Sequence, residues 1–238
     1  MSSRARVWTV LGLTVALVGG AFWWIQASEQ EEITAAAQAR EARRREREAE
    51  EQEQWGRVAD ESDALVPPML EGIQLGMSID RARRARPAME PNVVQRDPDE
   101  PDLVHYEERF ENGARAVYVF EQDPDRLQRI QVLSMLPSGD AIAPHLMAMN
   151  EQYGTPTGVW DCPQTGGVPT RRFTWRHGQV TVVDIFLVYG GRVSQTLYIA
   201  PTPVIGRSLV RSRCHPVPAD QIATFPAADP SQLQPDGP

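Results

Sequence analysis

Residues 179–200 read QVTVVDIFLVYGGRVSQTLYIA and contain two apolar runs separated by a pair of glycines. β-Branched and aromatic residues dominate both runs, and such runs on either side of a short glycine turn predict a β-hairpin. In an extended chain the first run would place on one face Val180, Val182 and Phe186, and on the other Thr181, Val183, Ile185 and Leu187. Because both faces are apolar, we expect this strand at the centre of a sheet with cover on both sides.

The same pattern recurs along the chain. A helix over 78–86, capped by Ser78 and ended by Pro87, and a helix over 138–153, ended by Gly154, are each followed by strand signals. The strands are expected over 103–110, 115–121 and 127–135, and again over 171–176, 179–189 and 192–200. Equivalent signals lie 60 to 66 residues apart. We therefore expect an α+β fold of two tandem helix-plus-three-antiparallel-strand units, forming a sheet with helices on one face.

Length and charge limit the possible functions. The chain has 238 residues and a formal net charge of -8, and all 24 basic side chains are arginine. A negative net charge does not favour binding to the negatively charged backbone of a nucleic acid, so no nucleic-acid partner is predicted. The tandem α+β domain is expected over 69–216, a length that suits one compact domain. The Pro-rich tail over 217–238 is expected to be disordered.

An uncharged apolar stretch, Val7–Ile25, lies near the N-terminus. It is long enough to cross most of a hydrocarbon core about 30 Å thick, so residues 1–27 are predicted to form a single transmembrane anchor. Arg4 and Arg6 precede it, which by the positive-inside rule places the N-terminus in the cytoplasm and the domain in the periplasm. The expected location is therefore the inner (cytoplasmic) membrane. A cleaved signal peptide, with a mature N-terminus near Ser28, is the alternative.

Residues 28–58 consist mainly of Ala, Glu, Gln and Arg, which favour helix formation. We expect a charged, solvated stalk helix here, supported by pairs such as Glu41 with Arg45. The arginine cluster at 43–47 could instead bind nucleic acid or anionic lipid, although its glutamate neighbours favour a solvated face. Residues 59–68 contain acidic residues and two prolines and are expected to be a linker.

Two short motifs resemble families of bacterial envelope domains. Residues 72–78, GIQLGMS, followed by a short helix and Pro87, resemble the opening of small outer-membrane-assembly lipoproteins of the SmpA/OmlA type. Residues 152–156, QYGTP, resemble the helix exits of related envelope domains, and the tandem pattern is similar to beta-lactamase-inhibitor-like proteins. The resemblance implies a non-catalytic role in the envelope, with another envelope protein as the partner.

The two cysteines, Cys162 and Cys214, are too few for a disulfide scaffold or a cysteine zinc site. If the domain lies in an oxidising compartment, the sequence predicts one disulfide between them. The alternative is a metal site or a thiol–imidazole pair that uses the neighbourhood of Cys162 and His215. That alternative would make the protein a hydrolase or a metal-dependent enzyme.

The four histidines, His105, His145, His177 and His215, show no metal-binding spacing. A carboxylate–imidazole pair is conceivable between Asp184 and the strand that carries His105 and Glu107, but ordinary surface polar residues are the expected role. No phosphate-binding glycine motif and no nucleophile-elbow motif occurs in a suitable context. No catalytic residue, cofactor or metal ligand is therefore predicted.

These observations predict a membrane-anchored envelope protein of a non-catalytic interaction or structural type. A small-molecule carrier is an alternative, with an apolar cleft lined by Trp160, Trp175 and Phe186. For Trp160 and Trp175, together with Phe173, packing on the face of the sheet is the more frequent role and is the expected one.

Overall fold

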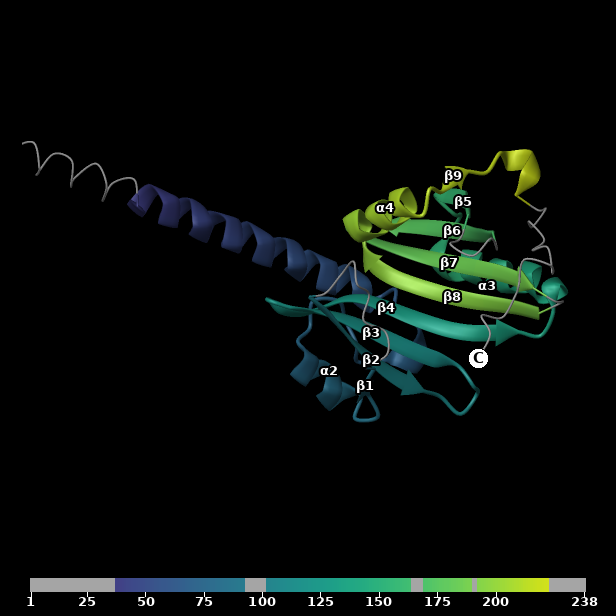
Figure 1. The fold of residues 1–238 in the computed structure, drawn as a ribbon, viewed down its shortest axis with the longest axis horizontal. Coiled ribbons are helices and arrows are strands. Elements are labelled where there is room, and N and C mark those ends of the chain that lie inside the picture. The colour runs from purple at the N-terminus through teal and green to yellow at the C-terminus, as the bar shows by residue number, and fades with distance from the viewer. Residues whose placement is uncertain (1–36, 93–101, 164–168, 190–191, 223–238) are drawn as a thin grey trace, which may run out of the picture. The chain divides into compact units, whose positions relative to one another are not determined.

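The computed structural model describes residues 37–92, 102–163, 169–189 and 192–222 (Figure 1). The predicted anchor over 1–27 and residues 223–238 of the predicted tail lie outside these ranges. Within the described ranges, no helix combines the length and the apolar character needed to cross a membrane. The chain divides into two units, Met1–Glu53 and Gln54–Pro238, which are considered separately.

In the first unit, residues 37–53 are helical and exposed, as expected for this part of the predicted stalk. Two ion pairs with a spacing of four residues lie on its surface: Arg45 Nη2 is 2.6 Å from Glu41 Oε1, and Arg44 Nε is 3.3 Å from Glu48 Oε1. Such exposed pairs each contribute only about 0.3–0.5 kcal/mol, so helix propensity and solvation account for most of this segment.

The second unit is built on one antiparallel sheet, whose strand order is β1-β2-β3-β4-β8-β7-β6-β5-β9. The first four strands are Glu90–Pro91 (β1), Leu103–Arg109 (β2), Arg115–Gln122 (β3) and Asp125–Leu136 (β4). The others are Gly158–Cys162 (β5), Thr170–His177 (β6), Val180–Tyr189 (β7), Arg192–Pro201 (β8) and His215–Pro216 (β9). The α+β fold class is therefore confirmed, with β7 inside the sheet between β6 and β8.

The finer expectation of two tandem units is wrong, because the described residues form a single nine-stranded sheet. The six expected strands are present, but β4 and β8 pair along their length, from Ile130 opposite Ile199 to Leu136 opposite Val193. The sequence also failed to predict β1, β5 and β9, which extend the sheet at its two margins. Continuous backbone pairing across β4 and β8 makes the strands one layer with one core.

The helical segments of the second unit lie before, between and after the strands. They are residues 54–63, the 3₁₀ turns η1 (Pro68–Leu70), η2 (Gly139–Ala141) and η3 (Ala219–Gln221), and the helices α2 (Ile79–Ala85), α3 (Ile142–Tyr153) and α4 (Thr202–Arg211). Ser78 caps α2 as predicted, since its hydroxyl accepts a hydrogen bond from the Arg81 N–H at 3.3 Å.

One face of the sheet carries the main apolar core. Alternate side chains of β3, β4, β6 and β8 are buried there, with Tyr118, Ile130, Trp175 and Ile199 fully enclosed. The cover comes from residues 54–63, η1, α2 and α3, whose packed side chains include Val58, Leu70, Ala82 and Met149. Each such buried side chain contributes about 1.5–3 kcal/mol relative to exposure.

Helix α4 covers the opposite face, so the expectation that helices lie on one face is wrong. Ile205 of α4 packs against Val183 of β7 and Ala200 of β8, which point away from the main core. Figure 1 shows α4 in front of the strands and α3 behind them. The physical reason is that β7 is apolar on both faces, and its second face needs cover.

Residues 59–68 are not the linker that their composition predicts. The helix continues to residue 63, and Val58, Ser62 and Leu65 are buried. These positions are four and three residues apart, so they share one side of the chain despite the charged residues between them. The Ser62 hydroxyl also accepts a hydrogen bond from the Leu75 N–H at 3.0 Å. The folded domain therefore begins near residue 54 rather than near residue 69.

Candidate functional site

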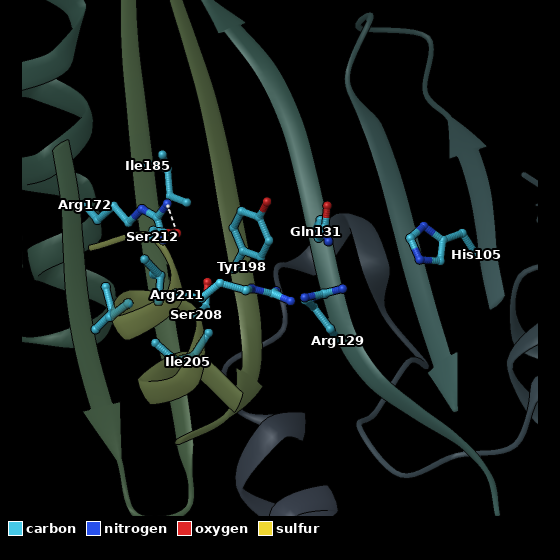
Figure 2. Close-up of a pocket in the computed structure, with 12 residues that line it drawn as sticks. His105, Arg129, Gln131, Arg172, Ile185, Tyr198, Ile205, Ser208, Arg211 and Ser212 are labelled. Atoms are coloured by element: carbon cyan, nitrogen blue, oxygen red, sulfur yellow. Dashed lines mark hydrogen bonds between the residues drawn. The ribbon is translucent and has the colours of Figure 1, made fainter. Parts of the chain in front are cut away.

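A basic pocket lies between α4 and the sheet face opposite the main core (Figure 2). Its volume is about 410 Å³, within the range of small-molecule sites, which is roughly 300–1,000 Å³. Strand residues form the floor of the pocket, and residues of α4 form the wall above it. We call this cavity the α4 pocket. Its basic residues are Arg129, Arg172 and Arg211, with His105 at its margin.

The sheet places the floor residues on one face by strict alternation. Tyr198 of β8 lies between Gln131 of β4 and Val183 of β7 in the strand register. Arg172 of β6 lies opposite Ile185 of β7. Because residues opposite each other on neighbouring strands share a face, residues from four strands meet beneath α4.

Helix α4 is held at its N-terminal end by β7. The Thr202 N–H donates a hydrogen bond to the Gln179 carbonyl at 2.7 Å, and the Thr202 and Thr181 hydroxyl oxygens are 2.9 Å apart. The apolar side chains Val204, Ile205 and Leu209 pack towards the sheet. The wall of the pocket is therefore fixed both by hydrogen bonds and by apolar contact.

The C-terminal end of α4 is held by a covalent bond. Cys214, three residues after α4, forms a disulfide with Cys162 at the end of β5. The short strand β9 then pairs with β5, with His215 opposite Asp161, and the Val217 N–H donates to the Val159 carbonyl at 2.9 Å. The predicted cysteine pair thus forms a bond that ties the chain just beyond α4 to β5.

Arg172 is held in place at one end of the pocket. Its Nη2 donates a hydrogen bond to the Ser212 hydroxyl just beyond α4, at 3.2 Å. Its Nε is buried and has no hydrogen-bond partner in the described part of the chain. Burial lowers the pKa of the Arg172 guanidinium from its ordinary value, an effect that Tyr198 partly offsets. The group nevertheless stays protonated, because an arginine pKa is far above neutrality.

The other arginines gather at the opposite end of the pocket. Figure 2 shows the guanidinium groups of Arg129 and Arg211 directed towards each other. A second hollow of about 220 Å³ adjoins this end; it shares Arg129, Ser208 and Arg211 with the pocket and adds Arg207 of α4. Among the described residues that line these two cavities, none is an Asp or a Glu. Guanidinium groups can bind an anion through paired N–H donors.

Of the residues that the sequence offered as candidates for a catalytic or metal site, only His105 lines the α4 pocket. Asp184 faces the main core and contacts His145 rather than His105, with 2.8 Å between His145 Nε2 and Asp184 Oδ2. The Cys162 sulfur is in a disulfide, so the proposed thiol–imidazole pair with His215 lacks its thiol. In the part of the chain that the structure describes, no group of three metal-ligating side chains could hold a metal ion.

The aromatic cleft considered from the sequence is not formed. Trp175 and Phe186 are buried in the main core, where Phe173 packs against both rings. Trp160 pairs with Arg172 in the register of β5 and β6 and therefore points to the other face, where its Nε1 donates to the Thr174 hydroxyl at 3.4 Å. The expected packing role is confirmed for Trp175 and Phe173.

No family model, curated protein or solved structure matches the chain. The geometry of the α4 pocket must therefore carry the functional argument alone. The site was not predicted from the sequence: Arg129 and Arg172 lie on predicted strands without a signal that they meet, and no helix was predicted after residue 200, where Arg211 lies. The signal that could have found α4 is a proline in the first turn followed by apolar residues four apart, Ile205 and Leu209.

Proposed function

We propose that this protein is a non-catalytic binding protein that holds a small anionic ligand in the α4 pocket. The observation that carries the proposal is Arg172, whose half-buried guanidinium lines a cavity. Among the described residues it has one neutral hydrogen-bond partner, and its buried Nε has none. A buried charge is normally paired or hydrogen-bonded, because its desolvation is otherwise costly. An anionic ligand would supply the missing counter-charge.

The pocket chemistry supports binding rather than catalysis. Its hydroxyl groups include Ser208 and Ser212, and neither is hydrogen-bonded to a histidine or a carboxylate among the described residues. A serine nucleophile needs such a base within hydrogen-bond reach. Arginines, a tyrosine and apolar side chains are instead the usual composition of a site that recognises an anion with an organic body.

We also propose that the N-terminal apolar stretch anchors the protein in the inner membrane and that the folded unit lies in the periplasm. The support comes from the charge distribution around Val7–Ile25 and from the disulfide between Cys162 and Cys214. Disulfides persist in oxidising compartments and are rare in the cytosol. Fusions of alkaline phosphatase and of a cytosolic fluorescent reporter after Pro238 test this topology. Phosphatase activity without fluorescence is expected, and the reverse result would overturn the proposed location.

Binding is tested by titration calorimetry on the full-length protein with octanedioate and with its uncharged dimethyl ester. We expect the anion to bind at least about 10-fold more tightly than the diester, because an ionised partner strengthens a hydrogen bond by about 1.5–3 kcal/mol. The substitution Arg172→Gln should remove most of this difference, and Arg172→Lys should restore part of it.

Arg176 provides the matched control for Arg172. It lies four residues along the same strand, on the same face of the sheet, is exposed, and does not line the α4 pocket. Arg176→Gln removes the same charge from the protein and should leave the affinity unchanged. Equal affinities for the anion and the diester, or equal losses in the two glutamine variants, would refute the proposed function.

A further inference from the structure

Arg172 and Ser212 lie together at one end of the α4 pocket, which we call the head end. Arg172 Nη2 donates to the Ser212 hydroxyl oxygen. Arg172 Nε lies on the same edge of the planar guanidinium as Nη2, and it is buried without a hydrogen-bond partner among the described residues. The Ser212 hydroxyl accepts the bond from Nη2 and can still donate through its own O–H. The head end therefore offers two neighbouring donors to one incoming group.

The adjacent residue, Arg171, shows how this edge of a guanidinium binds a carboxylate. Its Nε and Nη2 donate to the two carboxylate oxygens of Asp161, each at 2.8 Å. At the head end, the Ser212 hydroxyl occupies the position of the second oxygen at Nη2. A ligand carboxylate can therefore place one oxygen at Arg172 Nε and the other at the Ser212 O–H, and both hydrogen bonds would be strengthened by its charge.

The other basic residues of the pocket do not call for a second anionic group. His105, Arg129 and Arg211 each already take part in an interaction of their own. Arg172, by contrast, has a neutral hydroxyl as its hydrogen-bond partner among the described residues. The pocket therefore supports one anionic group in the ligand, and the place for this group is the head end.

The part of the pocket next to the head end is mainly apolar. Ile185 lies opposite Arg172 in the register of β6 and β7, and Val183 and Tyr198 form the next pair on this face, on β7 and β8. Ile205 of α4 packs towards the same strands. Figure 2 shows Ile185 next to Arg172 and the ring of Tyr198 farther along the pocket. Since β8 lies two strands from β6, this apolar stretch is about 10 Å long at a spacing of roughly 4.8 Å per strand.

We infer that the ligand of the α4 pocket is an amphiphilic monocarboxylate. Its carboxylate binds Arg172 and Ser212, and its apolar body lies between Tyr198 on the floor and Ile205 in the wall. This inference rests on the proposed function and makes it more specific, because it gives the head group, the number of charges and the two residues that bind the head group. Ser212 thereby becomes a residue that contacts the ligand directly.

The experiment is titration calorimetry on the full-length protein with octanoate, butanoate and the diacid octanedioate. We expect octanoate to bind at least about 10-fold more tightly than butanoate, because its additional methylene groups leave water on binding. From butanoate to dodecanoate the affinity should rise and then level off once the body fills the apolar stretch between β6 and β8. Octanoate should bind at least as tightly as octanedioate, since a second carboxylate would lose its hydration in an apolar region.

Two serine variants test the second donor of the head end. Ser212→Ala should weaken the binding of octanoate about 5- to 10-fold, because the carboxylate loses one of its two donors. Ser208→Ala is the matched control: Ser208 also lines the pocket, but it lies one helical turn before Ser212 and borders the adjoining hollow. This variant should leave the affinity unchanged. Circular dichroism and the thermal midpoint of each variant exclude loss of folding as the cause, and the comparisons on the native protein do not depend on either variant.

The outcomes separate the inference from the proposed function. If octanedioate binds more tightly than octanoate, or if octanoate binds no better than butanoate, the ligand is not an amphiphile with one head group and the inference fails alone. Equal losses in Ser212→Ala and Ser208→Ala would overturn the assignment of the head end. If neither octanoate nor octanedioate binds better than its uncharged methyl ester, the proposed function fails as well.

Discussion

Asp184 is fully buried in the middle of β7, and its carboxyl group belongs to a hydrogen-bond network with side chains from three other elements. His145 of α3 contacts one carboxylate oxygen at 2.8 Å, and the Gln195 amide donates to the other at 2.5 Å. The Ser134 hydroxyl donates in turn to the Gln195 carbonyl oxygen. These contacts connect α3, β4, β7 and β8 on the core side of the sheet.

The Asp184–His145 contact should be strongly coupled. Replacing His145 by Ala should destabilise the protein by roughly 1–3 kcal/mol, because the buried carboxyl group of Asp184 then loses a hydrogen-bond partner. Asp184→Asn should make the later loss of His145 less costly, so the double-mutant cycle should give a coupling of roughly 1–3 kcal/mol. Urea unfolding of the two single variants and the double variant measures this. Additive effects would show that the contact does not contribute to stability.

Tyr153 predicts a loss of stability at alkaline pH. Its hydroxyl donates to the Leu65 carbonyl at 3.0 Å, and burial, with a smaller effect from Asp184, raises the pKa of Tyr153 to about 12. A folded-state pKa above the unfolded value stabilises the protein fully below about pH 10, and this stabilisation is lost as the pH rises towards 12. The stabilisation at stake is roughly 3 kcal/mol at most, from 1.36 kcal/mol per pKa unit.

Unfolding experiments between pH 8 and pH 11 on the native protein and on Tyr153→Phe test whether Tyr153 causes the loss of stability at alkaline pH. The phenylalanine variant should be about 1 kcal/mol less stable at neutral pH, because it lacks the hydrogen bond to Leu65. Its stability should also fall less steeply above pH 10. Parallel pH profiles for the two proteins would assign the alkaline loss to other groups.

At the scale of single elements, α4 is the segment on which the proposed site depends. The disulfide and the β5–β9 pairing hold its C-terminal end, while hydrogen bonds from Thr202 hold the other. Substitution of both Cys162 and Cys214 by Ser should lower stability by about 4 kcal/mol on the chain-entropy account, given a separation of 52 residues. It should also weaken binding of the diacid, because the pocket wall is then held at one end only.

Hydrogen exchange distinguishes this local effect from global destabilisation. In the double-serine variant, the amides of α4 should exchange faster than those of β3 and β4 at temperatures where the variant remains folded. Reduction of the native protein should reproduce both the faster exchange and the weaker binding. Unchanged affinity after reduction would show that the apolar contacts of Ile205 and Leu209 alone position the helix.

The six principal strands could be predicted because short-range signals define them. Asn112-Gly113 and His177-Gly178 mark turns between runs of β-branched and aromatic residues, and Ser78 marks a helix start. The missed elements lack such signals: β1 and β9 have two residues each, and β5 gains its strand character from pairing with β6. Helix α4 was missed because its prolines suggest an end of structure rather than a helix start.

The pocket could not be predicted from local patterns. Arg129, Arg172 and Arg211 are far apart in sequence and meet only because β4 pairs with β8 and α4 folds back over β7. That pairing depends on which strand edges remain after each hairpin forms, and sequence alternation does not specify it. The disulfide could be predicted without knowledge of the strand pairing, because two cysteines allow only one disulfide.

At the scale of the whole folded unit, residues 54–68 belong to the domain. Val58 and Leu65 are buried in the core, Glu61 accepts a hydrogen bond from the Gln179 N–H at 2.6 Å, and Tyr153 bonds to Leu65. A chain that begins at residue 69 should therefore lose several kcal/mol, at about 1.5–3 kcal/mol for each buried apolar side chain. Since domains are stable by only about 5–15 kcal/mol, this chain should be unfolded or aggregated.

A chain that begins at residue 54 is the matched control, because it keeps every one of these contacts. It should show the same thermal midpoint as the full-length protein within a few degrees. Circular dichroism and size-exclusion chromatography of the two truncated chains decide the point. A cooperative thermal transition in the chain from residue 69 would show that the N-terminal segment covers the core without being needed for it.

The two margins of the sheet carry a consequence for self-association. Each margin is a strand of only two residues, and each of these strands contains a proline, Pro91 in β1 and Pro216 in β9, which has no amide hydrogen to offer. An incoming chain that adds to β1 or β9 therefore meets, among the described residues, a two-residue strand with one missing backbone donor, which is a poor template for strand addition. Strand addition at β1 or β9 should thus be disfavoured when copies are crowded side by side.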